Sequence, residues 1–372
     1  QLRLYNGTKA TAVSRVDAGE VCVIPGLQDT YAGMGLGAMP AGLQPRLQPV
    51  LTYAVDPRGA DLHACLAALR ELNDEDPQLH VQWSEQLQQI RVQVMGTIQI
   101  EVLTQLLARR YQLEVAFVAG GVLYQETITA PCEGVGHFEP LRHYAEVHLL
   151  LAPAPAGSGL TIDADCSLEV LGRNWQHQVL ANLQAKPQLG VLIGAPLTDV
   201  HITLVSGRAS IKHSVGGDFR EATWRALRQG LMMLRQRNAC RLLEPWYHFD
   251  LIVPAANIGR AMTDIQRMGG ECEAPEQRGE LARLIGRAPV ATMQGYAEEL
   301  RGYTHGQGQL SLVVAGYREA HDSAAIVAAK GYQPTADLAN TPDSVFCAHG
   351  AGYPVAWDAV PDAAHVPYRL AT

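Results

Sequence analysis

Residues 50–72 read VLTYAVDPRGADLHACLAALREL, a short apolar strand pattern followed directly by a helical one. Asp61 stands where a helix N-cap is expected, and the next apolar residues fall on one helical face: Leu62, Cys65, Leu66, Leu69 and Leu72. Residues 79–94 continue as LHVQWSEQLQQIRVQV, in which apolar and polar residues alternate on both sides of a turn near 84–86. This stretch therefore predicts a strand, a helix and two further strands.

A second helix and a last strand complete the pattern. After a break at Met95-Gly96, five apolar residues share one helical face: Ile98, Val102, Leu103, Leu106 and Leu107. Three more then alternate as in a strand: Leu113, Val115 and Phe117. The order β-α-β-β-α-β is that of the split βαβ unit, so a ferredoxin-like domain is predicted here.

The same order of elements returns near the C-terminus. Residues 246–253 predict a strand, and the helical stripe that follows stops at two glycines: Ile258, Met262, Ile265 and Met268, then Gly269 and Gly270. Strands near 271–274 and 282–289, a helix over 293–301 and a strand over 310–314 complete the unit. Two similar sandwiches therefore flank a middle region.

The middle region has a different pattern. A strand is predicted over 144–151, an extended turn over 152–159 and a helix over about 174–186. A strand from Val200 is expected to end in a polar loop over 207–217, and a long arginine-rich helix follows from Asp218. Residues 1–45 hold short β segments punctuated by glycine, typical of part of a β-barrel with too few strands to close. The predicted fold class is α+β and multidomain.

The composition indicates a globular chain of several domains. Its 372 residues, 47% hydrophobic and 18% charged, exceed one ordinary core. No apolar run approaches the roughly 18 residues of a membrane span, and Gln1 in place of Met indicates a processed or cut N-terminus. The seven cysteines form no C-x-x-C pair, which argues against a disulfide framework and a zinc ribbon. A cytoplasmic location is expected.

The charge is negative overall but unevenly distributed. A net charge of −8 argues against a protein that simply coats nucleic acid. Between Ser206 and Arg241, however, eight Arg or Lys residues stand against two acidic ones, a local balance of +6. Such a basic island suits a surface that meets phosphate at one end of the molecule. The preference for Arg over Lys suits bidentate phosphate contacts, and a GC-rich genome would give the same preference.

Several spaced motifs resemble elongation factor G and its relatives. Those like its third domain are Gln48-Pro-Val-Leu, Glu75-Asp-Pro, Met95-Gly and Tyr124-Gln-Glu-Thr-Ile. Those like its fifth domain are Leu243-Glu-Pro, Gly295-Tyr-Ala-Glu-Glu-Leu-Arg and Thr304-His-Gly-Gln-Gly. Two more are similar to the branch of the tetracycline ribosomal protection proteins: Gly216-Gly-Asp-Phe-Arg and Asn340-Thr-Pro-Asp-Ser-Val-Phe-Cys. The motifs keep their order over essentially the whole chain.

The resemblance implies a domain plan. Residues 1–45 would be the end of a second-domain β-barrel, 46–122 a ferredoxin-like third domain and 123–243 an S5-like βαβ fourth domain. Residues 244–320 would be a ferredoxin-like fifth domain and 321–372 a C-terminal extension. GTP hydrolysis, with GTP and Mg²⁺ as cofactors, would occur in a separate N-terminal domain. Because this sequence has no G-x-x-x-x-G-K-[ST] loop, we expect no catalysis, GTP binding or cofactor in this chain.

The resemblance also implies a partner, the ribosome, and excludes DNA and membranes. The fourth domain would be an arm that enters the decoding region of the small subunit, where its tip loops touch ribosomal RNA. In protection proteins this contact displaces tetracycline. Their tip has the sequence Ser-Pro-Val, whereas this chain has Ile211-Lys212-His213, which without proline is less rigid. A housekeeping or stress factor of the same superfamily is the alternative.

The candidate RNA-contact residues are Arg208, Ser210, Ile211, Lys212, His213, Ser214, Arg220 and Arg228. Lys212 suits phosphate, His213 can stack on a base, and Ile211 can wedge against a base face. An ordinary solvated loop is the alternative for the tip. For the helix arginines it is an i,i+4 pair of Glu221 with Arg225. Gly157-Ser158-Gly159 is either another arm loop or a structural turn.

Cys347, His349 and His321 suggest a different class of function, a metal site or a small-molecule Cys/His enzyme. Zinc sites usually show two ligand pairs at recognised spacings, and only one Cys-x-His is present. A Cys–His hydrolase needs an orienting residue that the sequence does not identify. A packed thiol beside a loop histidine accounts for the pattern better, so no metal is expected.

Overall fold

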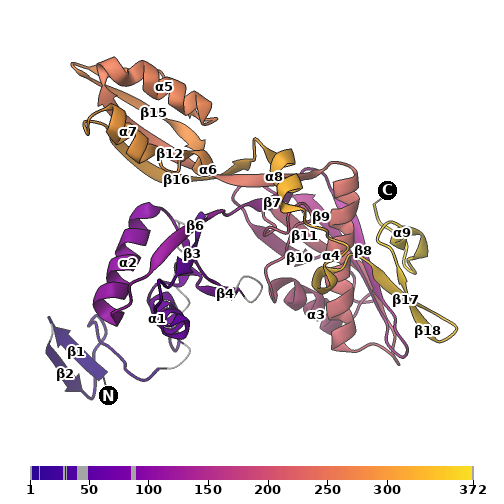
Figure 1. Ribbon diagram of the computed structural model, residues 1–372. Helices are drawn as coiled ribbons and strands as arrows, with labels where there is room; N and C mark the ends of the chain where they lie inside the picture. Colours follow the sequence, from indigo (N-terminus) through magenta and orange to yellow (C-terminus); the bar gives the residue numbers. More distant parts are fainter. Residues whose placement is uncertain are drawn as a thin grey trace. The chain divides into compact units, whose positions relative to one another are not determined.

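The structure is a computed structural model that describes residues 2–7, 9–27, 30, 32–39, 49–84 and 89–370 (Figure 1). The chain forms two compact units, Gln1–Gly121 and Val122–Thr372. The predicted domain boundary at 45/46, Gln48 of the third-domain motif and the end of the turn near 84–86 lie outside the described residues. No helix among the described residues has the length and apolar character needed to cross a membrane.

The first unit opens with a small antiparallel sheet. Strand β1 (Leu2–Asn6) pairs with β2 (Lys9–Val13), and Arg3 also bridges to Val23. This confirms β structure near the N-terminus, and its membership of a larger barrel stays a prediction.

The rest of the first unit confirms the predicted ferredoxin-like domain. Its elements are β3 (Leu51–Asp56), α1 (Leu62–Glu75), β4 (Gln82–Ser84), β5 (Gln89–Val94), α2 (Thr97–Tyr111) and β6 (Ala116–Val122). The strands lie in the order β4-β5-β3-β6, so the last strand is beside the first, as the split βαβ pattern requires. Asp61 caps α1 by accepting from the backbone N–H groups of His63 and Ala64.

The predicted buried face of α2 is only partly buried. Leu103 and Leu107 pack in the core, but Ile98, Val102 and Leu106 are 76%, 50% and 38% exposed. The apolar stripe is therefore wider than the face that the sheet covers. Leu79 also departs from its predicted strand, because it lies in a 3-10 turn, η1 (Pro77–Leu79).

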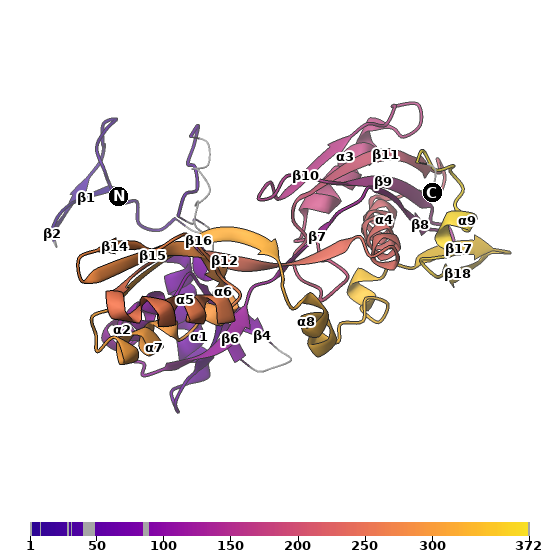
Figure 2. The ribbon, with the colours of Figure 1, turned by 90° about the horizontal axis from the view of Figure 1, so that it is seen from above.

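The second unit contains the arm domain. Its elements are β8 (Cys132–Phe138), β9 (Ala145–Pro153), β10 (Leu160–Ala164), α3 (Arg173–Gln184), β11 (Val200–Ala209) and α4 (Gly216–Gln236). Strands β10 and β11 are parallel with α3 between them, which confirms the βαβ unit. Helices α3 and α4 pack on the sheet over an apolar core that includes Val147, Leu149 and Phe219 (Figure 2).

The C-terminal segment joins the same sheet. Strand β17 (Ser344–Ala348) is parallel to β8, and β18 (Ala351–Val355) pairs with β17. The arm sheet therefore has the order β10-β11-β9-β8-β17-β18. The segment also contains α8 (Ser323–Lys330), η3 (Leu338–Asn340) and α9 (Val360–Ala363). What the sequence suggested as an extension after the fifth domain thus completes the fourth.

The second ferredoxin-like unit also matches its prediction. It contains β12 (Cys240–Pro254), η2 (Ala255–Asn257), α5 (Ile258–Arg267), β13 (Glu271–Cys272), β14 (Glu276–Arg278), β15 (Leu281–Pro289), α6 (Val290–Met293), α7 (Tyr296–Tyr303) and β16 (Gln309–Glu319). The strand order β13-β15-β12-β16 repeats that of the first unit. The helix predicted over 293–301 is two short helices, because Gly295 adopts φ +81° between them.

One strand crosses the predicted boundary between the fourth and fifth domains. Strand β12 is continuous from Cys240 to Pro254. Its first residues pair with β7 (Gln125–Ile128), and the rest pairs with β15 and β16. The boundary at 243/244 remains a prediction, and the backbone passes through it without leaving the sheet.

Candidate nucleic-acid interface

The loop between β11 and α4 was predicted to form an RNA-binding tip. It comprises residues 210–215, because β11 extends to Ala209 rather than ending near Gly207. Gly207 is buried against β9, where a Cβ would lie 2.7 Å from the carbonyl oxygen of Glu146. The close approach of the two strands therefore accounts for this glycine, which the sequence suggested as loop punctuation.

The two serines of the tip hold the loop closed. The backbone N–H of Ser210 donates to Ser214 Oγ at 2.7 Å, and the N–H of Ser214 donates to the carbonyl of Ser210 at 3.0 Å. Ser214 Oγ in turn donates to the carbonyl of Tyr144 at the start of β9. Both serines are half-buried, so their polar groups serve the loop itself.

The three residues between the serines face solvent. Ile211 is fully exposed, at 106%, and Lys212 and His213 are exposed as well. A cation, an imidazole and an apolar side chain thus stand together on a loop whose ends are fixed. These groups suit phosphate contact, base stacking and apolar contact with a base, respectively.

Asp218 fixes the tip to a neighbouring turn. Its carboxylate is buried, accepts from the backbone N–H of Val215 at 2.9 Å and lies 2.8 Å from His143 Nδ1. The N–H of Tyr144 also donates to it at 3.4 Å. The start of α4, the tip loop and the turn between β8 and β9 are therefore held as one structure.

An open hollow of about 760 Å³ lies beside the tip. Residues from both loops and from the C-terminal segment line it, among them Arg142, His143, Arg208, His213, Cys347 and His365. Arg142 and Arg208 are exposed, and Arg142 adopts φ +64° in the turn. Sequence reasoning identified Arg208 but missed Arg142 and His143. The polar run Pro140-Leu-Arg-His143 between two strands was the available signal.

The helix arginines have unequal roles. Arg220 is about half exposed, as an RNA-contact residue must be. Arg228 is 3% exposed and donates to the carbonyls of Leu189, Gly190 and Asn340 and to the hydroxyl of Tyr332. This position contradicts its prediction as an RNA-contact residue, because its donors are used inside the protein.

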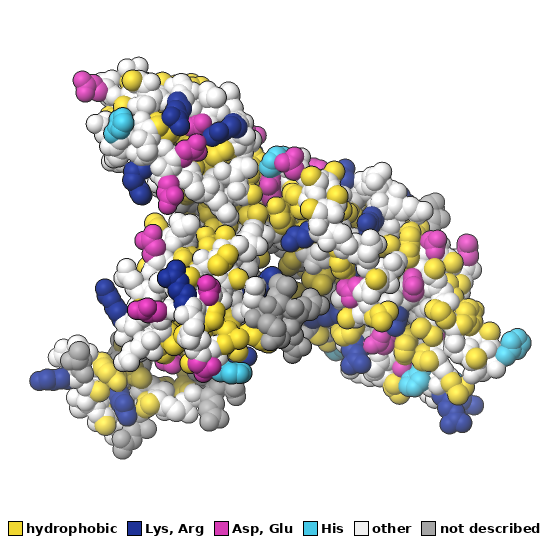
Figure 3. All heavy atoms as spheres, viewed as in Figure 1, with side chains coloured by type: hydrophobic (Ala, Val, Ile, Leu, Met, Phe, Trp, Pro, Cys, Tyr) yellow, Lys and Arg dark blue, Asp and Glu magenta, His cyan; other side chains and the backbone are white. Residues whose placement is uncertain are grey.

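The basic island of the sequence is therefore divided in space. Arg225 forms the i,i+4 pair with Glu221 that was considered as the alternative, at 3.2 Å, and also donates to the carbonyl of Asp343. On the face shown in Figure 3, Lys and Arg side chains are scattered among acidic ones. Within the island, Arg208, Lys212 and Arg220 remain as exposed cations near the tip.

The other face of the arm sheet carries a buried polar row, defined as Glu133, His148, Glu146 and His137. His148 Nδ1 lies 2.8 Å from Glu133 and its Nε2 lies 3.2 Å from Glu146, which also lies 2.6 Å from His137 Nδ1. All four side chains are at most 4% exposed. Burial raises the pKa of Glu146, but hydrogen bonds from the two histidines outweigh it and hold that pKa well below its ordinary value.

The C-terminal tail, residues 364–370, covers this row. The backbone N–H groups of His365 and Val366 donate to Glu146, at 3.0 and 2.6 Å. Those of Arg369 and Leu370 donate to Glu133, at 2.7 and 2.8 Å. The buried carboxylates are thus satisfied by a segment more than two hundred residues later in the chain.

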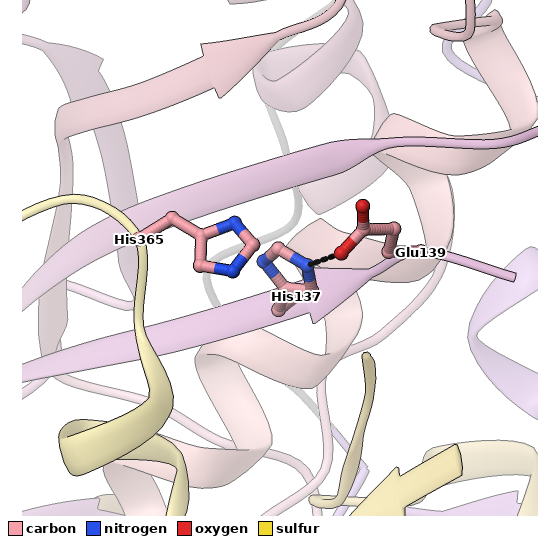
Figure 4. A group of neighbouring side chains, drawn as sticks. All are labelled: His137, Glu139 and His365. Atoms are coloured by element: carbon pink, nitrogen blue, oxygen red, sulfur yellow. Dashed lines mark hydrogen bonds and ion pairs between the residues drawn. The ribbon is translucent and has the colours of Figure 1, made fainter. Parts of the chain in front are cut away.

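His137 lies beside two further polar groups. Glu139 is 3.1 Å from His137 Nε2, and His365 approaches from the tail (Figure 4). Over the described residues, this is the group of three His, Cys, Asp or Glu residues that could hold a metal ion. Sequence reasoning missed it, because His365 is far from the other two in the chain.

The Cys/His site suggested by the sequence is not formed as expected. Cys347 lies on β17 and His349 in the turn after it, while His321 bonds to Glu244 at 2.8 Å, and none of the three is in the cluster with His137. The enzyme hypothesis stays untested. Gly157-Ser158-Gly159 is a structural turn, in which the N–H of Ser158 donates to the carbonyl of Pro155.

Comparison with known families matches three consecutive segments of the chain. Residues 47–119 match the family model for elongation factor G, domain III, and residues 120–233 match that for elongation factor G, domain IV. Residues 241–326 match the elongation factor G C-terminus. These ranges agree with the ferredoxin-like, arm and second ferredoxin-like regions of the structure.

Two individual proteins extend the comparison. The chain is 32% identical over 280 residues to "Elongation factor G 2" of Geobacter metallireducens, which is 73% of this chain and 40% of that protein. The chain thus spans about 40% of the length of this relative. A crystal structure of a protein from Thermus thermophilus covers 89% of this chain and 51% of its own, with a TM-score of 0.60 and 24% identity, a likeness of fold.

Proposed function

We propose that this chain, which carries domain III, domain IV and the C-terminal domain of an elongation factor G-like translational GTPase, binds the ribosome through its domain IV tip. One observation carries the proposal. Ile211, Lys212 and His213 are exposed on a loop whose two ends are fixed by Ser210 and Ser214. Fixed ends reduce the ordering entropy that a loop loses on binding.

The proposed ligand is ribosomal RNA of the small subunit near the decoding region. Lys212 and the neighbouring Arg208 would neutralise phosphates, whereas His213 and Ile211 would contact a base. The tip is a small basic area on a chain of net charge −8. Its binding should therefore depend on a few ionic contacts and weaken as salt rises.

The direct test is small-subunit binding by the intact protein at two salt concentrations. Replacing Lys212 and His213 together with Ala removes one charge and one stacking group. We expect a loss of roughly 1–3 kcal/mol of binding free energy and a smaller salt dependence. Lys330→Ala is the matched control, because Lys330 is an exposed lysine at the end of α8. Equal affinity of the double variant and the control would reject the tip assignment.

Two finer functions remain for the intact protein. Displacement of tetracycline is supported by the resemblance of residues 216–220 and 340–347 to protection proteins. A housekeeping or stress role in translocation is supported by the similarity to elongation factor G 2. Expression of the intact gene in a tetracycline-sensitive host separates them, since only displacement raises drug tolerance.

GTP hydrolysis is proposed for the intact protein and not for this chain. The sequence printed above contains no G-x-x-x-x-G-K-[ST] loop, and its matched segments are domains III, IV and the C-terminus. Calorimetry should detect no GTP or GDP binding by this chain. Micromolar affinity for GTP would overturn this part of the proposal.

A further inference from the structure

We propose that His137, Glu139 and His365 form a binding site for a divalent transition-metal ion, independently of any ribosome binding. His137 belongs to β8, Glu139 follows that strand and His365 belongs to the C-terminal tail. Each side chain offers one ligand atom, and these atoms all lie within 4.8 Å of one another (Figure 4). The site would join the tail directly to the arm sheet.

The buried polar row orients His137 as a metal ligand. Glu146 accepts from four groups: His137 Nδ1, His148 Nε2 and the backbone N–H groups of His365 and Val366. A carboxylate that only accepts requires the proton of His137 to be on Nδ1. A neutral His137 therefore presents the lone pair of Nε2, and a carboxylate behind a histidine is the usual outer partner of a metal site.

The lone pair of His137 meets another acceptor. Nε2 lies 3.1 Å from Oε2 of Glu139, so two electron-rich atoms face each other unless a cation lies between or beside them. In a tetrahedral zinc site with bonds of about 2.1 Å, two ligand atoms are separated by roughly 3.4 Å. The pair is therefore already near the spacing that one shared metal ion requires.

The third ligand comes from the tail and can adjust. His365 is exposed, lines the open hollow and lies 3.1 Å from the Tyr144 hydroxyl through its Nδ1. Small rotations of His365 and of the partly exposed Glu139 would close the remaining separations. The hollow gives an ion a route from solvent and leaves a fourth position for water.

The ligand types select the class of metal. Two imidazole nitrogens and one carboxylate oxygen suit zinc and similar divalent transition metals. Magnesium and calcium prefer sites made of oxygen atoms. A proton on Nε2 of His137 would also relieve its contact with Glu139, but it would give His365 no part. The role of His365 therefore separates the two explanations.

The test uses the purified chain, freed of metal by a chelator and titrated with zinc by calorimetry. His365→Ala removes the tail ligand and keeps the backbone N–H that bonds Glu146. Glu139→Gln removes a second ligand and is the alternative variant if the first does not fold. His177→Ala is the control, because His177 is an exposed histidine on α3 outside the cluster. Thermal melts without metal check that all variants are folded.

We expect one equivalent of zinc to bind the wild-type chain and the His177→Ala control alike. His365→Ala and Glu139→Gln should bind that equivalent at least tenfold more weakly. Cobalt should give the visible absorption of a four-coordinate ion in the wild type and lose it in His365→Ala. Zinc should also slow hydrogen exchange in the tail. Zinc binding that is absent, or equal in His365→Ala and the control, overturns the proposal and leaves the proton explanation.

Discussion

The two faces of the arm sheet are covered in different ways. On one face, glycines and aliphatic residues of β8 and β9 meet α4, and a Cβ on Gly134 or Gly136 would overlap the helix backbone. On the other face, the buried polar row meets the backbone of the C-terminal tail. Successive residues of the same two strands thus supply a tight apolar contact and a charged, hydrogen-bonded one.

The difference shows that each face needs a different kind of cover. Apolar side chains are stabilised by any well-packed surface, so the face under α4 depends on shape. Buried carboxylates need donors in place, and an unpaired one costs several kcal/mol. The polar face is therefore stable only while the tail is present, and changes on the two faces should have different consequences.

Glu146→Ala should have the largest effect, because it removes the shared acceptor of two histidines and two tail N–H groups. We expect a loss of about 3–5 kcal/mol, the usual cost of breaking a buried ion pair. Hydrogen exchange of the β8 and β9 amides measures it. Glu169→Ala, at an exposed carboxylate, is the control. A loss below about 1 kcal/mol would mean that the polar face tolerates the absence of its charge.

Gly136→Ala tests the apolar face. The added Cβ would overlap the backbone of Ala222 and Ala226, which cannot move without shifting α4. We expect a loss of about 3 kcal/mol in denaturant unfolding, at the upper end for overpacking. Gly217→Ala is the matched control, since nothing lies within 4 Å of a Cβ there. Similar stability of the two variants would contradict the close contact with the helix.

Arg228→Met tests whether the C-terminal segment is also held from the helix side. The change removes charged hydrogen bonds to three carbonyls and to Tyr332, at a cost of roughly 2–3 kcal/mol. Arg220→Met, at an exposed position of the same helix, should change stability by about 0.5 kcal/mol or less. Equal unfolding midpoints for the two variants would contradict the clamp.

His321→Gln should have the smallest effect, at the start of the C-terminal segment. The hydrogen bond to Glu244 raises the pKa of His321, so the protonated form is favoured in the folded chain. Its stabilisation is complete below the ordinary histidine pKa and is lost as pH rises through the raised value. The exposed site limits it to a few tenths of a kcal/mol. Wild type and variant should therefore differ more near pH 5.5 than near pH 8.5, and the opposite trend would contradict the pairing.

Both ferredoxin-like domains could be predicted from the sequence because their signals are local. Helical spacing after Asp61 and alternation over 89–94 fix each element through near neighbours. The partial exposure of α2 could not be predicted, since apolar spacing shows which side chains share a face but not how much of it the sheet covers.

The polar face of the arm sheet shows a second limit. Glu146 and His148 alternate with apolar residues, which is the pattern of a strand with one face in water. They are buried because the tail covers them, and the tail comes more than two hundred residues later. Similarly, the density of arginine in 206–241 did not reveal that Arg228 is buried. The exposed tip residues between Ser210 and Ser214 could be identified, since a loop between a strand and a helix is a local signal.

Strand β12 has a mechanical consequence. At about 3.3 Å per residue its 15 residues extend for roughly 50 Å, and the same backbone bonds β7 at one end and β15 and β16 at the other. A torque applied to the arm is therefore carried into the C-terminal domain by a single covalent beam, without a flexible joint to absorb it. The one irregularity, between Pro245 and Tyr247, is where such a beam would bend first under load.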